Sequence, residues 1–514
     1  MDTILGAISS WTILTTVFTL TLLYLLASIL LTKLRPGLRS LPGPFLASIS
    51  NIPRVYSCYK GHQMLYHISL HQKYGPFVRI GPNHVSFSDP SLIPQIYSIS
   101  SKFTKSAFYN VFDIKTPAGP MPTIFSVRDE GVHKTFKRPV AGAYAMSALR
   151  ELEPMNDECS AIFMEKMEER VGRDVDLGVW VHWYAWDTIT SITFSNRLGF
   201  MANERDMHSI IAAINGRLFY NSIVGQVPYL HRFLFGNPVV AYLATFIPSL
   251  ALLNSSRYIV DFTAQQLARY QNPSKESNVP DCQDMLSRFK RFKDGDMVMS
   301  DSELLSHASG NVLAGSDTTA ASLRSIFYYL CRTPSAHAAL LAEIDAADAR
   351  GALSDPITFA EAQGLPYLQA VIKEALRMHP AVGLLLERVV PAGGFTLPNG
   401  VHLSAGTVIG MNPWVAARDE TVYGSDAGTF RPERWVEQGE EKLKAMERNF
   451  LAFGSGTRTC LGKNVSLLEM SKLVPQVLRR FGFELTNPER EWVMQDYWFV
   501  QQKGLICKVK RREK

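Results

Sequence analysis

A glycine-rich segment near the C-terminus, FGSGTRTCLG at residues 453–462, carries one cysteine, Cys460, two residues after Arg458. The apolar stretch at 465–474 predicts a helix that ends at Pro475, and the positive end of such a helix would stabilise a thiolate at its start. Glycines let the backbone approach a flat group closely, and the permanent charge of Arg458 suits a carboxylate. A buried free cysteine in a turn is the alternative. The spacing favours a single thiolate ligand for a large anionic cofactor.

This segment resembles the haem-binding signature of the cytochromes P-450, F-x-x-G-x-R-x-C-x-G, at every defined position. The resemblance implies that Cys460 is the axial thiolate of a haem b iron, that Arg458 binds a haem propionate, and that Phe453 belongs to the cofactor-binding loop. A thiolate in this position pushes electron density to the iron and favours O–O cleavage. The resemblance also implies the cytochrome P-450 fold, which is mainly α-helical with small β-sheets.

A second candidate site lies in the helix-compatible stretch 304–330, where Gly315 is followed by Asp317, Thr318 and Thr319. A hydroxyl inside a helix can bond back to a carbonyl one turn earlier and open the helix locally. Thr319 is more simply explained as a packed residue. For the other two, the sequence resembles the family's A-G-x-D-T-T motif, which implies that Thr318 stabilises iron-bound oxygen and that Asp317 relays protons from solvent.

Glu374 and Arg377 lie three residues apart and share one face of a predicted helix, where an exposed pair contributes little. Arg434 occurs in the later segment PERW, residues 432–435, which resembles the family's P-E-R-F segment with Trp in the last place. The resemblance implies a buried structural triad that locks the cysteine loop. Removing one member would leave a buried charge unpaired, at a cost of about 3–5 kcal/mol.

Three more basic residues are candidates for holding the haem carboxylates. His133 and Lys137 lie four residues apart, in a segment that looks like the family's propionate-binding helix. Lys137 departs from the common pattern because Arg is usual there, and a lysine binds a carboxylate without the bidentate fork. Arg388 matches another propionate arginine of the family, and a strand-edge arginine is the alternative.

The N-terminal region has no charged residue between Asp2 and Lys33. This run exceeds the roughly 20 apolar residues that span a bilayer, and it lacks the basic start and cleavage site of a signal peptide. The sequence predicts a short lumenal tail at 1–10, a transmembrane anchor at 11–32, a basic, proline-rich hinge at 33–45 and a haem-thiolate catalytic domain at 46–514. Basic residues after the anchor predict a single-pass protein of the endoplasmic reticulum membrane with its catalytic domain on the cytoplasmic side.

The composition of the chain argues against several classes of protein. The 514 residues are 46% hydrophobic, and the net charge of +6 is not gathered into a dense basic stripe, so nucleic-acid binding is not indicated. The six cysteines are scattered without a C-x-x-C pair, which indicates neither a disulfide framework nor a zinc site. Short strand patterns predict hairpins at 77–87 and 395–403, and the polar stretch 270–284 predicts a surface connection.

The family's topology implies a substrate chamber walled by apolar and aromatic stretches, although such stretches are also typical of plain core. These walls are expected at residues 103–125, 218–234, 304–314, 382–386 and 498–500. Their composition favours a hydrophobic substrate. The apolar run at 227–235 is a candidate lip that rests on the membrane and admits substrate from the bilayer.

These features predict a monooxygenase that uses O2 and electrons from a separate membrane-bound NADPH-cytochrome P-450 reductase, with cytochrome b5 as a further candidate partner. Lys134, Arg138, Lys463 and Lys472 are candidates for a basic docking face, although exposed charges more often serve solubility. Residues 74–83 and the cysteine loop resemble filamentous-fungal members near pisatin demethylase. That resemblance implies hydroxylation, demethylation or multi-step oxidation of a terpenoid, polyketide or aromatic intermediate of secondary metabolism.

Two other functions remain open at this stage. One is a redox-independent haem-thiolate isomerase or dehydratase, and such relatives tend to lose the acid–alcohol pair that Asp317 and Thr318 form here. The other is a non-enzymatic, membrane-tethered haem protein, which would need neither an oxygen-handling helix nor an enclosed apolar chamber.

Overall fold

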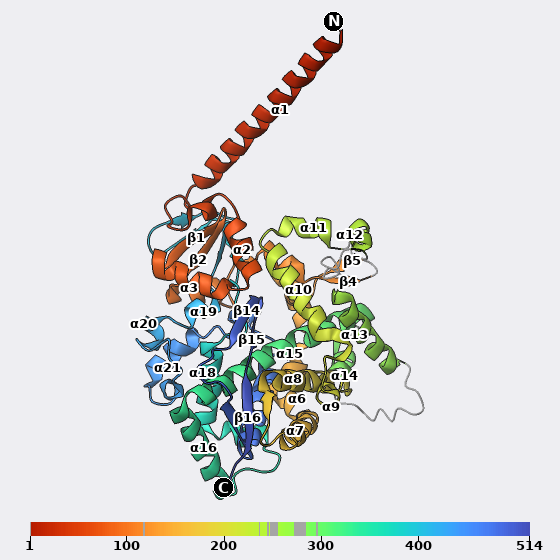
Figure 1. Ribbon diagram of the computed structural model, residues 1–514, viewed down its shortest axis with the longest axis vertical. Coiled ribbons are helices and arrows are strands. Elements are labelled where there is room, and N and C mark those ends of the chain that lie inside the picture. Colours follow the sequence, from red (N-terminus) through yellow and green to blue (C-terminus); the bar gives the residue numbers. More distant parts are fainter. Residues whose placement is uncertain are drawn as a thin grey trace.

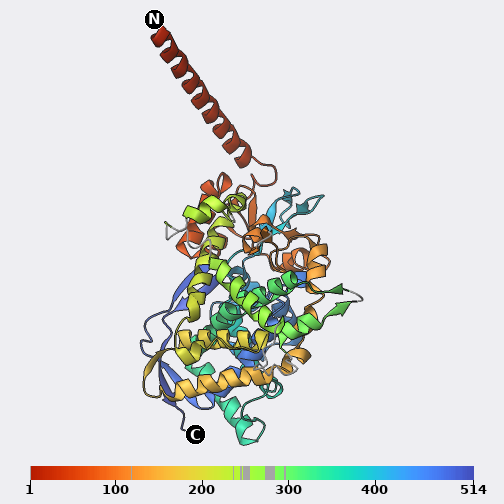
Figure 2. The ribbon, with the colours of Figure 1, turned by 90° about the vertical axis from the view of Figure 1, so that its right-hand side faces the viewer.

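The computed structural model describes residues 2–116, 119–235, 237–243, 246, 255–271, 284–294 and 297–513. One long helix, α1 (Asp2–Lys33), projects from one end of the body, and the C-terminus lies at the other end (Figure 1, Figure 2). Within α1, the segment Trp11–Lys33 has a mean hydropathy of 2.2 and contains no buried residue. The apolar N-terminal region therefore forms one helix that is long enough to span a membrane, as predicted.

The described chain is mainly helical, as predicted. Its longer helices are α2 (Ile52–Lys60), α3 (Gln63–Tyr74), α5 (Glu130–Lys137), α7 (Glu153–Glu168), α8 (Leu177–Phe194), α10 (Ile210–Val224), α13 (Ser255–Gln271), α14 (Met285–Arg291), α15 (Asp301–Arg332), α16 (Pro334–Ala349), α18 (Pro366–Met378), α21 (Glu440–Arg448) and α22 (Lys463–Leu478). Shorter α-helices are α4 (Ile93–Ile96), α6 (Met146–Arg150), α9 (Phe200–Asn203), α11 (His231–Leu234), α12 (Pro238–Leu243), α17 (Phe359–Gln363), α19 (Pro413–Ala416) and α20 (Glu420–Tyr423). Single 3-10 turns are η1 (Phe45–Ser48), η2 (Pro90–Leu92), η3 (Ala107–Phe112), η4 (Ala141–Tyr144), η5 (Met207–Ser209), η6 (Pro228–Leu230), η8 (Pro432–Trp435) and η9 (Gly456–Arg458).

The strands form small sheets beside the helices. The largest has the order β1 (Phe77–Gly81), β2 (His84–Phe87), β12 (Val408–Gly410), β9 (Arg388–Val389) and β3 (Thr104–Lys105). The others are β10 (Phe395–Thr396) with β11 (His402–Leu403); β13 (Phe481–Leu485) with β16 (Ile506–Arg511) and β6 (Asp174–Asp176); β14 (Val493–Tyr497) with β15 (Phe499–Lys503); β4 (Ile114–Thr116) with β5 (Gly119–Met121); and β7 (Lys293–Asp294) with β8 (Met297–Val298). In the first hairpin Phe77 pairs with Phe87, and in the second Phe395 pairs with Leu403, so both predicted hairpins are confirmed.

Helices α8 and α15 form the centre of the body (Figure 1). Ser300 starts α15 with a capping box. Its hydroxyl accepts from the N–H of Glu303, and the Glu303 carboxylate accepts from the N–H of Ser300. Most of α8 is apolar and buried, as expected for a helix enclosed on all sides. The pair forms a rigid frame for the polar residues at its interface.

Arg79 connects the first sheet to the end of α1. Its guanidinium donates to the carbonyls of Thr32 at 2.6 Å, Lys33 at 2.9 Å and Pro82 at 2.9 Å. The first two carbonyls lie in the last turn of α1, where backbone acceptors lack helical partners and a cation is favourable. Leu38, which follows, is buried in the core below the sheet. The predicted hinge, residues 33–45, is therefore held against the body at Lys33 and Leu38.

Two sequence-based expectations need correction or fall outside the described residues. The helix after Cys460 does not end at Pro475 but continues as α22 to Leu478. Nearly all residues of α22 from Val465 onward are buried, and this packing offsets the roughly 3 kcal/mol that an internal proline costs a helix. The surface connection expected at 270–284 falls mostly on residues 272–283, outside the described ranges.

Candidate active site

The cysteine loop joins α21 to α22 and is shaped by glycines. Cys460 donates its backbone N–H to the carbonyl of Phe453 at 2.8 Å, which closes the loop. Gly454 and Gly456 have positive φ angles of 68° and 64°. A Cβ on Gly456 would meet the carbonyl oxygen of Tyr97 at 1.8 Å, so no other residue fits this position without displacing the backbone.

The surroundings of the Cys460 thiol suit a metal ligand. Burial among protein atoms raises the pKa of the thiol, whereas the backbone N–H groups of Gly462 and Lys463 at the start of α22 lower it. The residue is nevertheless exposed by surface area. Neighbouring atoms surround the thiol on several sides without covering it. Such a thiol becomes a thiolate when a metal cation binds it, so the site fits an iron ligand.

A short stretch of α15 is accessible although the helix is otherwise largely buried. Ala314 is exposed, and Gly315 and Thr318 are half-buried. The Thr318 hydroxyl donates to the carbonyl of Ala314 at 2.9 Å, so the back-bond that the sequence predicted is present. Since a hydroxyl rotates about its C–O bond, Thr318 can also donate toward the accessible side.

Side-chain contacts bring this part of α15 beside the cysteine segment. The Tyr144 hydroxyl donates to Asn311 Oδ1 at 3.3 Å, and its carbonyl accepts from Asn464 Nδ2 at 3.0 Å. The hydroxyls of Thr319 and Ser466 lie 3.1 Å apart, and Thr319 is buried, in agreement with its interpretation as a packed residue. The accessible turn of α15 and the cysteine loop are therefore neighbours in the fold.

Asp317 faces a different direction from Thr318, toward α8. Its Oδ1 lies 2.6 Å from Nε2 of His182, and the Asp317 side chain is only 3% exposed. The sequence interpretation identified the acid but missed its histidine partner. The available signal was a histidine in the mostly apolar first half of α8.

The candidates for the haem carboxylates on α5 do come together with the cysteine loop. Arg458 contacts the Glu130 carboxylate through Nε at 3.0 Å and Nη2 at 2.9 Å, and its buried Nη1 has no hydrogen-bond partner among the described residues. Lys137 donates to the carbonyl of Thr457 at 3.4 Å. Burial and then the neighbouring cations lower the pKa of His133 to about 3, so this imidazole is neutral.

Two more cations lie on the five-stranded sheet. Arg388 is buried on β9 and donates to the carbonyl of Glu387 at 2.9 Å. Its register partner on β3 is Lys105, which is 4% exposed and was missed by the sequence interpretation. Lys105 Nζ donates to the carbonyl of Phe125 at 2.5 Å and lies 4.2 Å from the Tyr109 ring centroid. Burial, followed by two nearby arginines, holds the pKa of Lys105 well below its usual value. A set of basic groups this rich in unused donors fits a cofactor with two carboxylates.

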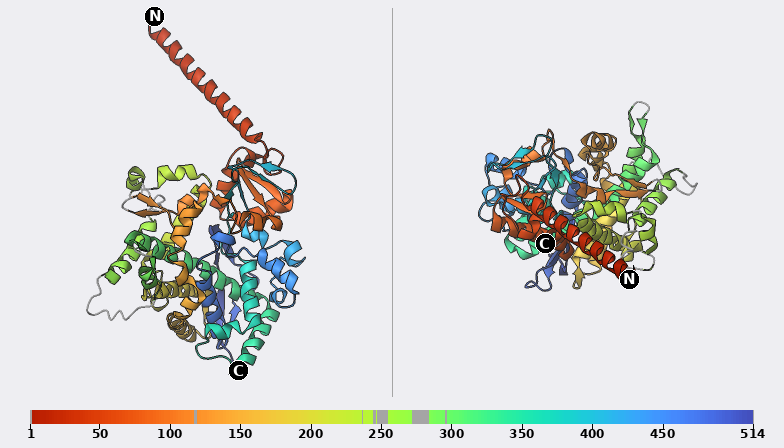
Figure 3. Two further views of the ribbon diagram at one scale, coloured as in Figure 1. Left: turned by 180° about the vertical axis from the view of Figure 1, so that it is seen from behind. Right: turned by 90° about the horizontal axis from the view of Figure 1, so that it is seen from above.

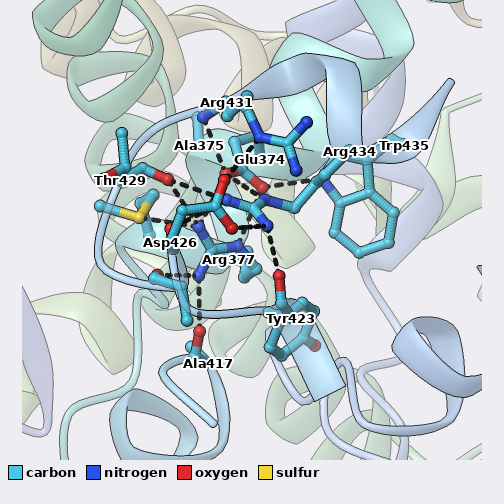
Figure 4. A network of polar contacts seen from close by, with 12 residues as sticks. Glu374, Ala375, Arg377, Ala417, Tyr423, Asp426, Thr429, Arg431, Arg434 and Trp435 are labelled. Atoms are coloured by element: carbon cyan, nitrogen blue, oxygen red, sulfur yellow. Dashed lines mark hydrogen bonds and ion pairs between the residues drawn. The ribbon is translucent and has the colours of Figure 1, made fainter. Parts of the chain in front are cut away.

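The predicted triad is present and is part of a larger network (Figure 4). Glu374 is fully buried and accepts from Arg377 Nη2 at 2.7 Å, Arg434 Nε at 2.9 Å and the Trp435 indole N–H at 2.8 Å. The Trp435 ring contacts Phe450, with 5.8 Å between centroids, and Phe450 lies just before the cysteine loop. Through these contacts the network can hold the cysteine loop in position.

Aromatic side chains gather beside the turn between β14 and β15. Trp498 has a positive φ of 79°, and its ring lies 5.2 to 6.0 Å from four others, centroid to centroid. These rings belong to Phe108, Tyr109, Phe112 and Phe125. Two of the predicted chamber walls, 103–125 and 498–500, therefore meet in one apolar group.

The predicted basic docking face is only partly accessible. Lys134, Arg138 and Lys463 are exposed. Lys472 is not, because its side chain is 2% exposed and pairs with Glu153 at 2.8 Å and Asp157 at 2.9 Å. Including Lys472 in the docking face was wrong, since α22 turns this side chain into the interior.

The family model for cytochrome P-450 matches residues 40–507 of the chain. The chain is 39% identical over 485 residues to the cytochrome P-450 monooxygenase cicH of Emericella nidulans, an alignment that covers 93% of this chain and 95% of that protein. It is 38% identical over 453 residues to a cytochrome P-450 monooxygenase of Aspergillus terreus, covering 86% and 90%. With the cytochrome P-450 monooxygenase gsfF of Penicillium aethiopicum it shares 35% identity over 477 residues, covering 92% and 93%.

Proposed function

Because this chain belongs to the cytochrome P-450 family and is a haem-thiolate monooxygenase, we propose that it oxidises a lipophilic natural-product intermediate with electrons from a separate membrane-bound NADPH-cytochrome P-450 reductase. Cytochrome b5 is a second candidate electron donor. The single observation that carries this proposal is the position of the accessible turn of α15, which presents Thr318, beside the cysteine segment. An accessible thiol alone suits any haem protein, whereas a hydroxyl on the neighbouring turn of α15, in a segment that also carries an acid, suits oxygen chemistry.

The chain's own residues divide the work of holding the cofactor. Cys460 supplies the thiolate, with the N–H groups at the start of α22 directed at its sulfur. Arg458 offers its free Nη1 while Glu130 fixes its orientation. His133, Lys137 and Arg388 are the further candidates to bind the two carboxylates. When bound, the haem supplies the iron at which O2 is reduced by two electrons and two protons, one oxygen atom entering the substrate and the other leaving as water.

The oxygen side of the site depends on two neighbouring side chains. Thr318 presents a rotatable hydroxyl on the accessible turn of α15, where it can orient a ligand and donate a proton. Asp317 is held at the α8 interface with its Oδ1 on His182, so a proton relay through this acid requires its carboxylate to turn toward Thr318. The apolar group around Trp498 excludes water from the substrate side.

The position of the anchor supports substrate entry from a membrane. Helices α2, α11 and α12 lie at the end of the body from which α1 projects (Figure 1, Figure 3). Ile52 and Tyr56 on α2 and Tyr229 and Phe233 at the predicted lip are all more than half exposed. A groove of about 570 Å³ lies between α2, the end of α10 and η6, lined by Val55, Tyr59, Ile223, Val227 and others. We assign this face to the bilayer of the endoplasmic reticulum, with the body cytoplasmic.

The substrate class follows from the apolar lining and from the resemblance to fungal enzymes of the pisatin-demethylase type. A terpenoid, polyketide or aromatic intermediate of secondary metabolism fits both. The test is incubation of microsomes containing the chain with reductase, NADPH and a fungal metabolite extract, followed by mass spectrometry. Products that gain oxygen or lose a methyl group are expected, and Cys460→Ala should abolish them. Unchanged products from Cys460→Ala would refute the haem-thiolate mechanism.

The alternative functions are separated by the same preparation. A redox-independent isomerase or dehydratase would convert its substrate without NADPH and reductase. A tethered haem protein without enzymatic activity would bind haem and give no product. The intact Asp317–Thr318 pair favours the oxygen-dependent reaction over both.

A further inference from the structure

Arg217 is a buried cation on α10, directly before the predicted chamber wall at 218–234. The residue is only 5% exposed. Its Nη2 donates to the backbone carbonyls of Val111 at 2.7 Å and Asp113 at 3.1 Å, in the predicted wall at 103–125. These carbonyls lie on either side of Phe112, whose ring is 5.2 Å from that of Trp498. The guanidinium therefore holds the turn that supplies Phe112 to the apolar group of the substrate side.

The rest of this guanidinium is unused. Nη1 is buried and has no hydrogen-bond partner among the described residues. No carboxylate of those residues forms an ion pair with Arg217, and the charge of Asp113 acts only from further away. Burial lowers the pKa of Arg217 to about 10, so the group still carries its charge at neutral pH. Arg217 thus offers a buried positive charge and two N–H donors without an anion to receive them.

A second unused group lies beside Arg217. The guanidinium is 5.4 Å from the ring centroid of Tyr220 and 4.4 Å from that of Phe235. His231 stacks on Phe235, with 4.7 Å between centroids, and its Nδ1 lies 2.8 Å from the Tyr220 hydroxyl. Burial, and then Arg217, lower the pKa of His231 to about 4, so this imidazole is neutral. Its Nε2 is buried without a partner among the described residues, and it is a donor when Tyr220 donates to Nδ1.

A purely structural role for Arg217 accounts for only part of this arrangement. Fastening α10 to two backbone carbonyls of the wall at 103–125 needs only a neutral donor, and burying a permanent charge for that purpose is unfavourable. An anion at Nη1 would offset the cost of burial. A carboxylate matches the planar donors of a guanidinium, and its hydrogen bonds to a charged donor are the stronger kind.

We propose that the substrate carries a carboxylate and that Arg217 binds it, with His231 as a second donor. The apolar remainder of the molecule then lies against the aromatic group around Trp498. An acid held at one end limits which carbon atoms reach the cysteine loop, so Arg217 sets the position of oxidation as well as the class of substrate. This proposal rests on the oxygen-dependent function proposed above and narrows it to acidic natural-product intermediates.

The first test uses the microsomes, reductase, NADPH and fungal extract of the experiment above. One portion of extract is untreated, one is methylated so that acids become methyl esters, and one is methylated and then saponified. We expect oxygen-gain products from the first and third portions and at least about tenfold less from the second, as for the loss of a charge-assisted hydrogen bond.

Each other outcome of this test has a definite meaning. Equal product from the methylated and untreated portions would overturn the inference and leave the proposed function intact. A loss that saponification does not reverse would assign the acidic group to a phenol and overturn the carboxylate. No product from the untreated portion would instead overturn the proposed function, and the inference with it.

The second test measures binding to full-length holoenzyme in lipid nanodiscs, from the ligand-induced shift of the haem absorption band. The ligands are the acid identified in the first test and its methyl ester. We expect the wild type to bind the acid at least about tenfold more tightly than the ester, and Arg217→Gln to bind the two equally. Glutamine keeps a donor for the wall carbonyls but has no charge.

The matched control is Arg332→Gln at the end of α15. Arg332 also donates to a backbone carbonyl, that of Pro488 at 2.8 Å, and lies over the Tyr328 ring, but it is exposed. This variant should keep the wild-type preference for the acid. Equal loss of affinity for acid and ester in Arg217→Gln would show a purely structural role, and equal affinity of the wild type for both ligands would exclude an anion site. Either result would overturn the inference.

Discussion

The substitution Glu374→Gln tests whether the network in Figure 4 supports the cysteine loop. Glu374 is the shared acceptor for two guanidinium groups, those of Arg377 and Arg434, whose side chains are 0% and 1% exposed. Each guanidinium also donates to backbone carbonyls, for example Arg377 to Ala417 at 2.6 Å and Arg434 to Tyr423 at 2.6 Å. These carbonyls hold the arginines in place, so neither guanidinium group can move into solvent when the carboxylate is replaced.

The cost follows from this burial. Breaking a buried, hydrogen-bonded ion pair by removing one partner costs about 3–5 kcal/mol. The glutamine amide retains one acceptor oxygen but cannot neutralise either cation, so we expect Glu374→Gln to fall in this range. An unfolding entropy of about 2.1 cal/mol/K per residue means that Tm falls by about 1 °C per kcal/mol in a chain of this length. The expected loss is therefore about 3–5 °C.

The assay is thermal unfolding of the holoenzyme together with the fraction that keeps the thiolate-type carbon-monoxide band. The matched control is Lys373→Ala, on the same helix. Lys373 pairs with Glu447 at 2.6 Å, but the two side chains are 35% and 57% exposed. Screening by water limits such a pair to about 0–1 kcal/mol, so the control should shift Tm by less than about 1 °C. Equal effects of Glu374→Gln and Lys373→Ala, or full retention of the band in Glu374→Gln, would refute the reasoning.

Three further predictions concern other parts of the chain. Burial raises the pKa of Asp496 to about 8, so the native protein holds a proton that the unfolded chain has lost above about pH 4. Stability should therefore fall between about pH 4 and 8 in the wild type relative to Asp496→Asn, and parallel Tm profiles of the two proteins would contradict this. Arg79→Gln should speed tryptic cleavage at Arg39 at least about tenfold while the carbon-monoxide band persists, because each lost charge-assisted hydrogen bond contributes about 1.5–3 kcal/mol. An unaltered cleavage rate would show that Arg79 does not hold the end of α1. Thr318→Ala should keep haem binding and raise the share of NADPH electrons released as hydrogen peroxide, measured with reductase, and an unchanged share would exclude a role for this hydroxyl in proton delivery.

Local sequence patterns predicted several elements correctly because neighbouring residues alone specify those elements. The turn signal at Asn399-Gly400 specifies a tight hairpin, and Gly400 does adopt a positive φ of 83°. The uncharged N-terminal run forms α1 because no tertiary contact is needed for it to be helical and apolar. Pro475 misled the interpretation because a proline ends a helix only when no packing offsets its cost. Lys472 misled it because a charge in a sequence does not reveal its partners.

The sequence by itself determined the chemistry of the site: one cysteine in a glycine-rich loop, an acid beside an alcohol, and an apolar helix ahead of the body. These depend on residue type and short spacing. Only the tertiary structure decided that His182 lies on Asp317 and that Glu130 orients Arg458. Those partners are separated by 135 and 328 positions in the chain. Residues so far apart meet because helices and sheets pack their buried faces together, and no local spacing encodes which polar groups that packing brings into contact.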